Sequence, residues 1–309
     1  MRKVSIVASS LVVLGVAAGC SSAGPNGEPV GPSLEDLQTL QGNPGYPELN
    51  PYPRHFPSQG RFVHEQAHGG GSASNLSYHG GPTIKDAHVV AIFWGPSWSS
   101  SDPISTSLAG FISKYGTSGE YNVITQYSGI QKSPLASDSP AVFYDSTQPP
   151  TNVTDAIIQG EASKYFAQVG DVNAIYEVFL PSGVYSSDGS ATSCGGPNLQ
   201  YCAYHGNFAS GGKDVKYGAM PYPSCAGCQS TGFSDTQNFE HFISHETREA
   251  VTDEDGNAWY DRRGYEADDK CAWSPNPFTD SSVGTNADGT GYAYQYEWSN
   301  ANSGCVKTR

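Results

Sequence analysis

The sequence predicts an α/β or α+β fold, a single domain in which helices pack on a mixed sheet and disulfides stabilise the loops. Three observations lead to this prediction. From residue 77 onward, apolar runs of strand length alternate with segments of helical periodicity. The 309 residues include 36 Gly and 21 Pro but only 15% charged residues, which is typical of a loop-rich extracellular protein. Six of the seven cysteines follow residue 190, and this even number favours three disulfides in an exported chain.

The first predicted elements are a strand and a helix. Residues 88–94 form a continuous apolar run with the length of a buried strand. Asp102 and Pro103 then predict a helix start, because Asp accepts hydrogen bonds at an N-cap and Pro fits the first helical position. One face of this helix would carry Ile104, Leu108, Phe111, Ile112 and Tyr115. A short strand is expected at residues 141–144.

The middle of the chain predicts a second helix and further strands. Residues 154–169 have helical periodicity. The side chains expected to face the core are Ile157, Ile158, Tyr165 and Phe166. Residues 174–180 and 213–220 predict strands, and the Gly/Ser-rich residues 182–208 between them predict a loop. Residues 292–298 alternate after a turn signal and predict the closing strand.

The most strongly marked helix is predicted over residues 238–252. Ser234 and Asp235 are both good N-caps, because their side-chain oxygens can accept from the free amides of the first turn. The apolar face carries Phe239, Ile243 and Ala250. Asp253 and Gly256 lie just past the last periodic residue, where a helix would stop.

This helix carries a motif typical of metal sites. His241, His245 and Glu249 are four residues apart, so their side chains share one face. From His245 to Glu249 the sequence reads His-Glu-x-x-Glu, one residue away from the zinc motif His-Glu-x-x-His, whose Glu is a general base. A third ligand would have to come from downstream, where Glu266 and Asp269 are the candidates.

The motif predicts a metal centre with defined roles. We expect His245, Glu249 and Glu266 to hold a zinc ion, with Glu246 as the general base. The side chains that could orient a ligand by hydrogen bonding are Asp269, His241 and His205. Two carboxylate ligands would lower the Lewis acidity of the ion, and oxygen-rich sites suit harder ions, so the alternatives are calcium, a structural ion or none. An acidic helix of this kind also fits a plain solvated face.

Seven segments in chain order form a wider pattern. They are Tyr78-His79-Gly80-Gly81-Pro82, Phe93-Trp94-Gly95, Cys202-Ala203-Tyr204-His205-Gly206, Cys225-Ala226-Gly227-Cys228, His245-Glu246-x-x-Glu249-Ala250, Glu266-x-x-Asp269-x-Cys271 and Tyr296-Glu297-Trp298-Ser299-Asn300. This set resembles the EXORDIUM or phosphate-induced protein family, known mostly as secreted plant proteins with bacterial relatives. The resemblance covers about residues 78–305 and implies a class and a location rather than a reaction. The order of elements is also similar to that of zincin-like zinc peptidases, an analogy of fold.

The first residues predict a targeting segment. Arg2 and Lys3 precede an apolar run at residues 4–18, and Ala-Gly-Cys ends at Cys20, as in a bacterial lipoprotein signal. The expected organisation is a signal peptide at 1–19, a Pro/Gly-rich tether at 20–76 and an EXORDIUM-like, metallohydrolase-like domain at 77–309. Lipid on Cys20 would anchor the protein in the bacterial cell envelope, at the outer membrane or cell surface, whereas a plain secretory signal would release it.

The connectivity of the six later cysteines is open in the sequence. Proximity along the chain favours the pairs Cys194–Cys202 and Cys225–Cys228, which leaves Cys271–Cys305. The alternative for the Cys-x-x-Cys loop is half of a zinc site or a redox pair.

Two hypotheses for function follow. The first is an exported, membrane-anchored zinc metallohydrolase acting on a peptide or another amide or ester outside the cell. The second is a non-catalytic surface protein that binds cell-wall or host glycan, with a structural ion in the acidic block and Trp side chains as sugar platforms. The formal net charge of −14 argues against a nucleic-acid partner, because phosphate neutralisation needs clustered Lys and Arg.

Overall fold

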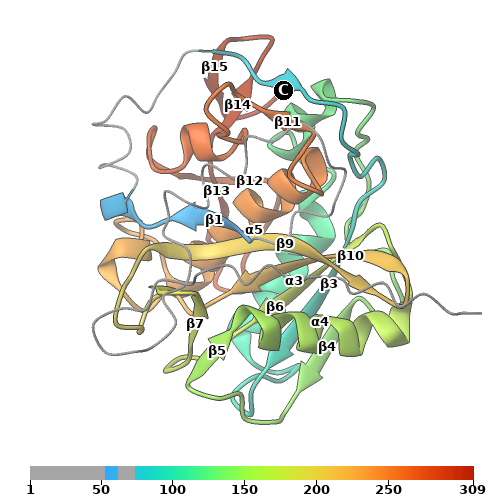
Figure 1. Ribbon diagram of the computed structural model, residues 1–309. Coiled ribbons are helices and arrows are strands. Elements are labelled where there is room, and N and C mark those ends of the chain that lie inside the picture. Colours follow the sequence, from blue (N-terminus) through green and yellow to red (C-terminus); the bar gives the residue numbers. More distant parts are fainter. Residues whose placement is uncertain (1–52, 62–73) are drawn as a thin grey trace, which may run out of the picture. The chain divides into compact units, whose positions relative to one another are not determined.

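A six-stranded mixed sheet lies at the centre of the structure (Figure 1). Its strands are, in spatial order, β1 (Arg54–Pro57), β9 (Tyr201–Ser210), β10 (Lys213–Met220), β6 (Ala174–Phe179), β3 (His88–Trp94) and β4 (Val142–Asp145). The computed structural model describes residues 53–61 and 74–309, all within one compact unit that spans 48–309. Strands β10, β6, β3 and β4 are parallel, whereas β9 runs antiparallel to both β10 and β1. A mixed α/β class is therefore confirmed.

The remaining elements of the described residues are short strands, helices and 3₁₀ turns. Four smaller sheets of the described residues are formed by β5 (Asn152–Thr154), β7 (Tyr185–Asp188) and β8 (Ala191–Thr192); β2 (Ser77–Tyr78) and β11 (Trp259–Tyr260); β12 (Phe278–Thr285) and β13 (Gly291–Tyr294); and β14 (Glu297–Ser299) and β15 (Gly304–Val306). The helical segments are α3 (Pro103–Tyr115), α4 (Asp155–Val169), α5 (Asp235–Thr252) and the 3₁₀ turns η1 (Tyr121–Gln126), η2 (Ala226–Cys228) and η3 (Asp269–Cys271).

Two hydrophobic cores cover the two faces of the main sheet. Successive strand residues point to opposite faces, so Ala91 and Phe93 of β3 enter one core while Val90 and Ile92 enter the other. Helices α3 and α5 pack in the first core and α4 packs in the second (Figure 1). The result is three layers, helix, sheet and helix.

Helix α5 is the element that positions the candidate site. Its N-cap is Ser234, whose side chain accepts from Gln237 N while the Gln237 side chain accepts from Ser234 N, a complete capping box. Every side chain from Gln237 to Thr252 is buried, including charged ones. The predicted helix is confirmed, and the alternative of a solvated acidic face is wrong, because α5 lies between the sheet and the C-terminal segments.

Several other predicted elements are confirmed. β3 and β10 have the predicted bounds, and α3 begins as predicted, with the Asp102 carboxylate accepting from Ser105 N at 2.7 Å. The predicted face of α4 is partly wrong, because Ile157 is 37% exposed. The buried face of α4 instead follows Ile158, Ala162 and Tyr165.

Two predicted irregular regions contribute to the main sheet. Residues 182–208, predicted as a loop, contain β7, β8 and most of β9. The predicted tether at 20–76 contains β1, which pairs with β9 at the edge of the sheet. The predicted strand at 292–298 is divided into β13 and β14.

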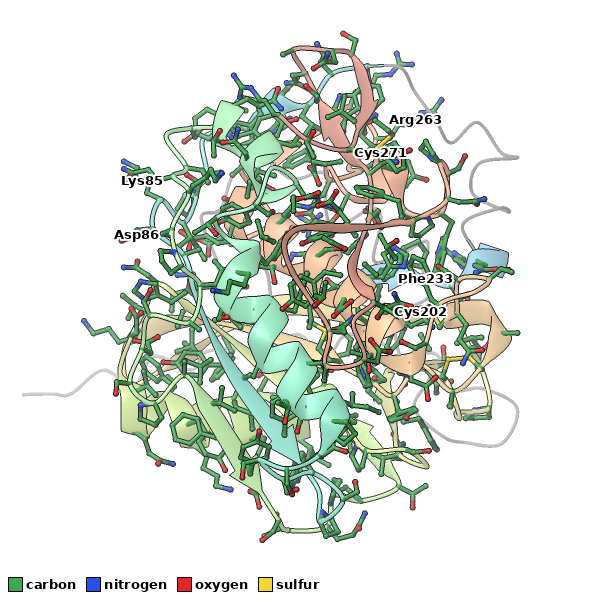
Figure 2. The ribbon with its side chains drawn as sticks, turned by 180° about the vertical axis from the view of Figure 1, so that it is seen from behind. Lys85, Asp86, Cys202, Phe233, Arg263 and Cys271 are labelled. Carbon is green, nitrogen blue, oxygen red and sulfur yellow. A yellow bond between two sulfur atoms is a disulfide. The ribbon has the colours of Figure 1, made fainter. Side chains whose placement is uncertain are left out.

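Three disulfides join the cysteines that follow residue 190 (Figure 2). They are Cys194–Cys225, Cys202–Cys228 and Cys271–Cys305. The prediction for Cys271–Cys305 is confirmed. The two proximity pairs are wrong, because β9 and β10 form a hairpin whose return brings η2 beside the segment leading into β9. Each cysteine of the Cys-x-x-Cys loop bonds a different partner, so the redox-pair alternative is also wrong.

Some expectations concern residues that the structure does not describe. The predicted signal peptide at 1–19, lipidation of Cys20 and most of the predicted tether lie outside the described residues. Within residues 53–61 and 74–309, no helix has the length and apolarity needed to cross a membrane.

Candidate metal site

Four elements bring ionisable side chains together beneath β1. Helix α5 supplies His245, Glu246 and Glu249, and β9 supplies His205. The segment that leads into η3 supplies Glu266, and η3 itself begins with Asp269. All of these side chains are at most 1% exposed except that of Asp269, which is 20% exposed. The site is therefore built inside the domain, with Asp269 at its open side.

Two groups of three potential ligands share one carboxylate. His205, Glu249 and Glu266 form one group, and His245, Glu249 and Asp269 form the other. Within each group, one ligand atom of every side chain lies within 4.8 Å of the other two. Glu249 is therefore the central residue of the site.

The carboxylate of Glu249 is held so that one oxygen faces both histidines. Its Oε1 accepts from Asp269 N at 2.9 Å. Its Oε2 lies 3.1 Å from His245 Nε2 and 3.8 Å from His205 Nδ1. A backbone amide thus fixes the direction in which Glu249 points.

Several buried atoms at this position have no hydrogen-bond partner. They are His245 Nε2, His205 Nε2, Glu246 Oε1 and both carboxylate oxygens of Glu266. A buried polar atom without a partner carries a desolvation penalty, and native structures rarely leave several together. The atoms of His205, His245 and Glu266 belong to the two groups of potential ligands, and a bound cation would give them partners.

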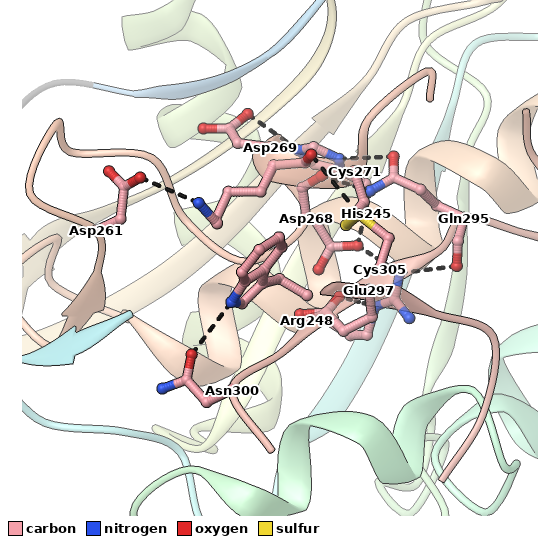
Figure 3. Close-up of a disulfide and its surroundings, with 12 residues drawn as sticks. His245, Arg248, Asp261, Asp268, Asp269, Cys271, Gln295, Glu297, Asn300 and Cys305 are labelled. Carbon is pink, nitrogen blue, oxygen red and sulfur yellow. Dashed lines mark hydrogen bonds and ion pairs between the residues drawn. A yellow bond between two sulfur atoms is a disulfide. The ribbon is translucent and has the colours of Figure 1, made fainter. Parts of the chain in front are cut away.

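His245 is oriented by Gln295, which contacts its Nδ1, whereas Glu249 lies beside its Nε2; Figure 3 shows Gln295 beside His245. The Gln295 side-chain amide donates to the Asp268 backbone oxygen at 2.7 Å and to the Asp268 carboxylate at 3.1 Å. Its oxygen therefore faces His245 Nδ1, at 3.1 Å, and His241 Nε2, also at 3.1 Å. His245 must then carry its proton on Nδ1, which leaves Nε2 with a free lone pair.

A second layer of charge lies behind Gln295. The guanidinium of Arg248 is fully buried and pairs with Asp268 and, through Nε at 2.9 Å, with Glu297 (Figure 3). Removing one partner of such a buried network leaves an uncompensated charge. This network fixes Asp268, and Asp268 in turn fixes Gln295.

The site carries more acid than base. Arg54 of β1 lies 3.5 Å from Glu266 and 3.9 Å from Asp253, and it also faces Glu249 and Asp269. Burial raises the pKa of the carboxyls of Glu246, Glu249 and Glu266 well above the usual glutamate range. A bound divalent cation would offset this cost of ionising them.

The two histidines are suited to the same cation. Burial lowers the pKa of His205 well below its usual range and also lowers that of His245. Both imidazoles are therefore neutral near pH 7, which is the form that binds a metal. The residues present fit a divalent metal with mixed nitrogen and oxygen ligands.

The structure distributes the predicted site residues differently from the sequence expectation. His245 and Glu266 belong to different groups, joined through Glu249. His205 and Asp269 lie among the potential ligands rather than behind them, whereas His241 contacts Gln295 and belongs to neither group. Glu246 Oε2 accepts from His205 Nδ1 at 2.9 Å.

Sequence reasoning missed Arg54 and Gln295. Arg54 lies in a short segment that was assigned to the tether, and its partners are about 200 positions away along the chain. Gln295 lies between two short strands and belongs to no motif. No local signal could have found either residue, because both act through pairing with distant segments.

Two other groups of potential ligands have simpler explanations. Cys194, Cys225 and Cys228 lie together because disulfides hold them there. His88, Asp138 and Asp171 are half-buried, and His88 Nδ1 lies 2.5 Å from an Asp171 carboxylate oxygen. A hydrogen-bonded ion pair accounts for that arrangement.

Comparison of the chain with family models, with curated proteins and with solved structures found no match.

Proposed function

We propose that this protein is an exported metal-dependent hydrolase of the EXORDIUM type, with zinc as its cofactor and a peptide as its substrate. The observation that supports this most is that buried ligand atoms of His205, His245 and Glu266, which have no hydrogen-bond partner, lie around Glu249. Two imidazoles favour zinc over calcium, since calcium takes oxygen ligands almost exclusively. The mixed sheet with a His-Glu helix packed on it supports a zincin-like arrangement as part of the same proposal.

The residues of the site divide into ligands and a base. His245, Glu249, Glu266, His205 and Asp269 are the side chains that would hold the ion. A bound zinc ion polarises a carbonyl and lowers the pKa of a water molecule.

Glu246 supplies the proton acceptor in this proposal. One of its oxygens is held by His205, and the other is buried without a partner, so it is free to take a proton. Burial raises the pKa of Glu246, which favours transfer of a proton to it and its later release to a leaving group.

A second function is favoured by the burial of the ligands. Four of the five potential ligand side chains are at most 1% exposed, which is typical of structural sites closed to substrate. On this alternative the ion stabilises a non-catalytic surface protein that binds cell-wall or host glycan.

Elemental mass spectrometry of the purified full chain tests the proposed cofactor. We expect about one zinc ion per chain in the wild type and at least a tenfold lower content in Glu249→Ala. Glu240→Gln is the matched control, because Glu240 is a buried acid of the same helix that accepts from Ala293 N, outside the site. Wild-type protein without zinc, purified without chelators, would contradict the proposal, and calcium in its place would favour a structural ion.

Glu246→Gln then separates the two functions. In a hydrolase this variant should retain its zinc but lose at least a hundredfold in turnover of peptides cleaved by the wild type. If a screened peptide library yields no wild-type cleavage while zinc is bound, the structural alternative is favoured.

A further inference from the structure

Strand β1 is a short outermost strand beside β9 (Figure 1). It pairs antiparallel with β9, placing Arg54 opposite His205, His55 opposite Tyr204 and Phe56 opposite Ala203. One of the potential metal ligands therefore lies directly across from β1. Because β1 is at the edge, it is attached to the sheet through one neighbour only among the described strands.

The side chains of β1 alternate between two environments. Arg54 and Phe56 point to the face that carries α5, where they contact site residues. His55, between them, points to the other face, where it stacks on Tyr201 with ring centroids 4.4 Å apart. The strand thus places every second side chain over the candidate site.

Phe56 and Arg54 cover different parts of the site. The Phe56 ring stacks on the His245 ring at 4.2 Å and on the Trp273 ring at 5.0 Å, and it is fully buried. Arg54 donates to Gly256 O at 2.7 Å and lies beside the Glu266 carboxylate. Two alternate side chains of one short strand thus contact a potential ligand from each group.

We propose that the edge of β9 beside α5 is a binding groove for an extended peptide, and that β1 occupies this groove as an internal ligand. Strand addition to a free edge uses backbone hydrogen bonds for affinity and pockets for alternate side chains for specificity. The preferred peptide has a basic residue two positions before an aromatic one, the spacing of Arg54 and Phe56. While β1 is seated, the groove is closed to other peptides.

The groove continues beyond β1. A cavity of about 450 Å³ lies next to the chain that follows Pro57, and its walls include Leu199, Gln200 and Gly227. Ser58 N donates to Gln200 O at 2.9 Å, so the main-chain pairing extends past the strand. Ser58, Gly60 and Arg61, which continue from β1, also line this cavity, so residues that follow the strand lie along the groove as well.

A displacement experiment on the full chain tests the proposal. The probe is a fluorescein-labelled peptide with the sequence Pro-Arg-His-Phe-Pro-Ser, identical to residues 53–58. The seated strand competes at an effective concentration of the order of millimolar, so wild-type protein should bind micromolar probe weakly. Phe56→Ala weakens the internal ligand and leaves the pocket on His245 and Trp273 for the ring of the probe. Fluorescence polarisation should show at least tenfold tighter binding to Phe56→Ala.

The controls separate the groove from general loosening. Ile158→Ala loosens the second core without touching β1 and should bind the probe as weakly as the wild type. A probe with Ala in place of Phe should bind Phe56→Ala at least tenfold more weakly than the original probe. The proposal would be overturned if all three proteins bound the probe equally. It would also be overturned if Phe56→Ala bound the probes with and without the Phe ring equally well.

A milder variant covers the case in which Phe56→Ala does not fold. Phe56→Leu keeps much of the buried volume and should show the same gain in smaller degree. If neither variant has a cooperative unfolding transition, with or without probe, β1 is an integral part of the core and the proposal is wrong.

The inference rests on the proposed function only in that a bound peptide would then be hydrolysed; the binding itself does not depend on it. Binding is therefore measured on zinc-loaded and on chelator-treated protein, without reading hydrolysis. Tight peptide binding by Phe56→Ala, together with wild-type protein that holds no zinc when purified without chelators, would support the groove and contradict the metallohydrolase. Zinc bound to the wild type, with no tighter peptide binding by Phe56→Ala, would support the metallohydrolase and contradict the groove.

Discussion

At the scale of single residues, the amide of Gln295 decides which nitrogen of His245 is free. The amide nitrogen faces Asp268 and the amide oxygen faces the histidine, so both ends of the group have defined partners. The spacing of His245 and Glu249 on a helix could be predicted from sequence, because helical geometry is local. The proton position on His245 could not, because Gln295 comes from a segment about fifty residues away.

We predict that Gln295→Met lowers zinc affinity ten- to a hundredfold, the usual effect of losing a hydrogen-bond partner of a metal-binding histidine. Methionine has a similar length but offers His245 no amide oxygen. Competition with a zinc-binding dye would measure the change. Asn286→Leu is the matched control, since it removes another buried amide that contacts neither histidine. Equal affinity of wild type and Gln295→Met would mean that Gln295 does not orient His245.

Glu177 gives a pH-dependent prediction at the same scale. It lies in β6 and accepts from the Thr247 hydroxyl of α5 at 2.8 Å. Burial raises its pKa to about 8, whereas an unfolded chain titrates near the ordinary value of 4.5. Between these values the folded state holds the extra proton, so this group's contribution to stability is lost as pH rises from about 4.5 through 8.

The variant Glu177→Gln cannot lose that contribution. Its stability advantage over the wild type should therefore grow between pH 5 and pH 9, by at least ~1.4 kcal/mol, the equivalent of one pKa unit. Urea unfolding at several pH values measures this. Asp280→Asn should show no such growth, because hydrogen bonds from Ser282 lower the pKa of Asp280. Parallel pH profiles for wild type and Glu177→Gln would contradict the assignment.

At the scale of elements, prediction from sequence succeeded where the pattern is local. The caps and periodicity of α5, and the apolar runs of β3 and β10, are visible in short windows. The sequence of β9 predicts a loop, because its Gly, Cys and His residues do not alternate as expected of a strand. β1 was missed because it has four residues, including Pro57, and its partner strand is about 150 positions away. The zincin-like arrangement and the EXORDIUM resemblance stay predictions.

The link between η3 and β15 gives a prediction for an element pair. Cys271 ends η3, which begins with the potential ligand Asp269, and the disulfide to Cys305 closes a separation of 34 residues. Replacing both cysteines by serine should lower the free energy of unfolding by about 3–4 kcal/mol, through loop closure in the unfolded chain. Urea titration of oxidised protein would show it. An unchanged midpoint would mean that the buried contacts around η3 hold it without the bridge.

At the scale of the whole molecule, many of the acidic side chains that give the chain its negative net charge are buried inside the domain. Glu177, Glu240, Glu246, Glu249, Glu266, Asp268 and Glu297 are all at most 1% exposed. Arg248 and Arg54 compensate some of them, and the rest are expensive to ionise without a cation. The stability of the domain should therefore depend on bound metal.

We predict that a chelator lowers the thermal midpoint of the full chain and that added zinc restores it. Zinc at a free concentration a hundred times its Kd would contribute about 2.7 kcal/mol to the folded state. Scanning calorimetry with and without chelator measures the shift. Glu249→Ala should show a midpoint that does not respond to chelator, because its central ligand is absent. A response of equal size in that variant would place the bound ion elsewhere.

The β9–β10 hairpin turns at Gly211 and Gly212, both with positive φ, and two disulfides join the chain on either side of it. Cys194 and Cys202 lie before the turn, and Cys225 and Cys228 lie after it. A protease that cuts at this exposed turn would therefore release no fragment, because two disulfides still join the two parts of the chain. The cut becomes visible on a denaturing gel only after a thiol reduces these disulfides. Damage at this turn would leave the strand that carries His205 attached to the segment that leads into α5.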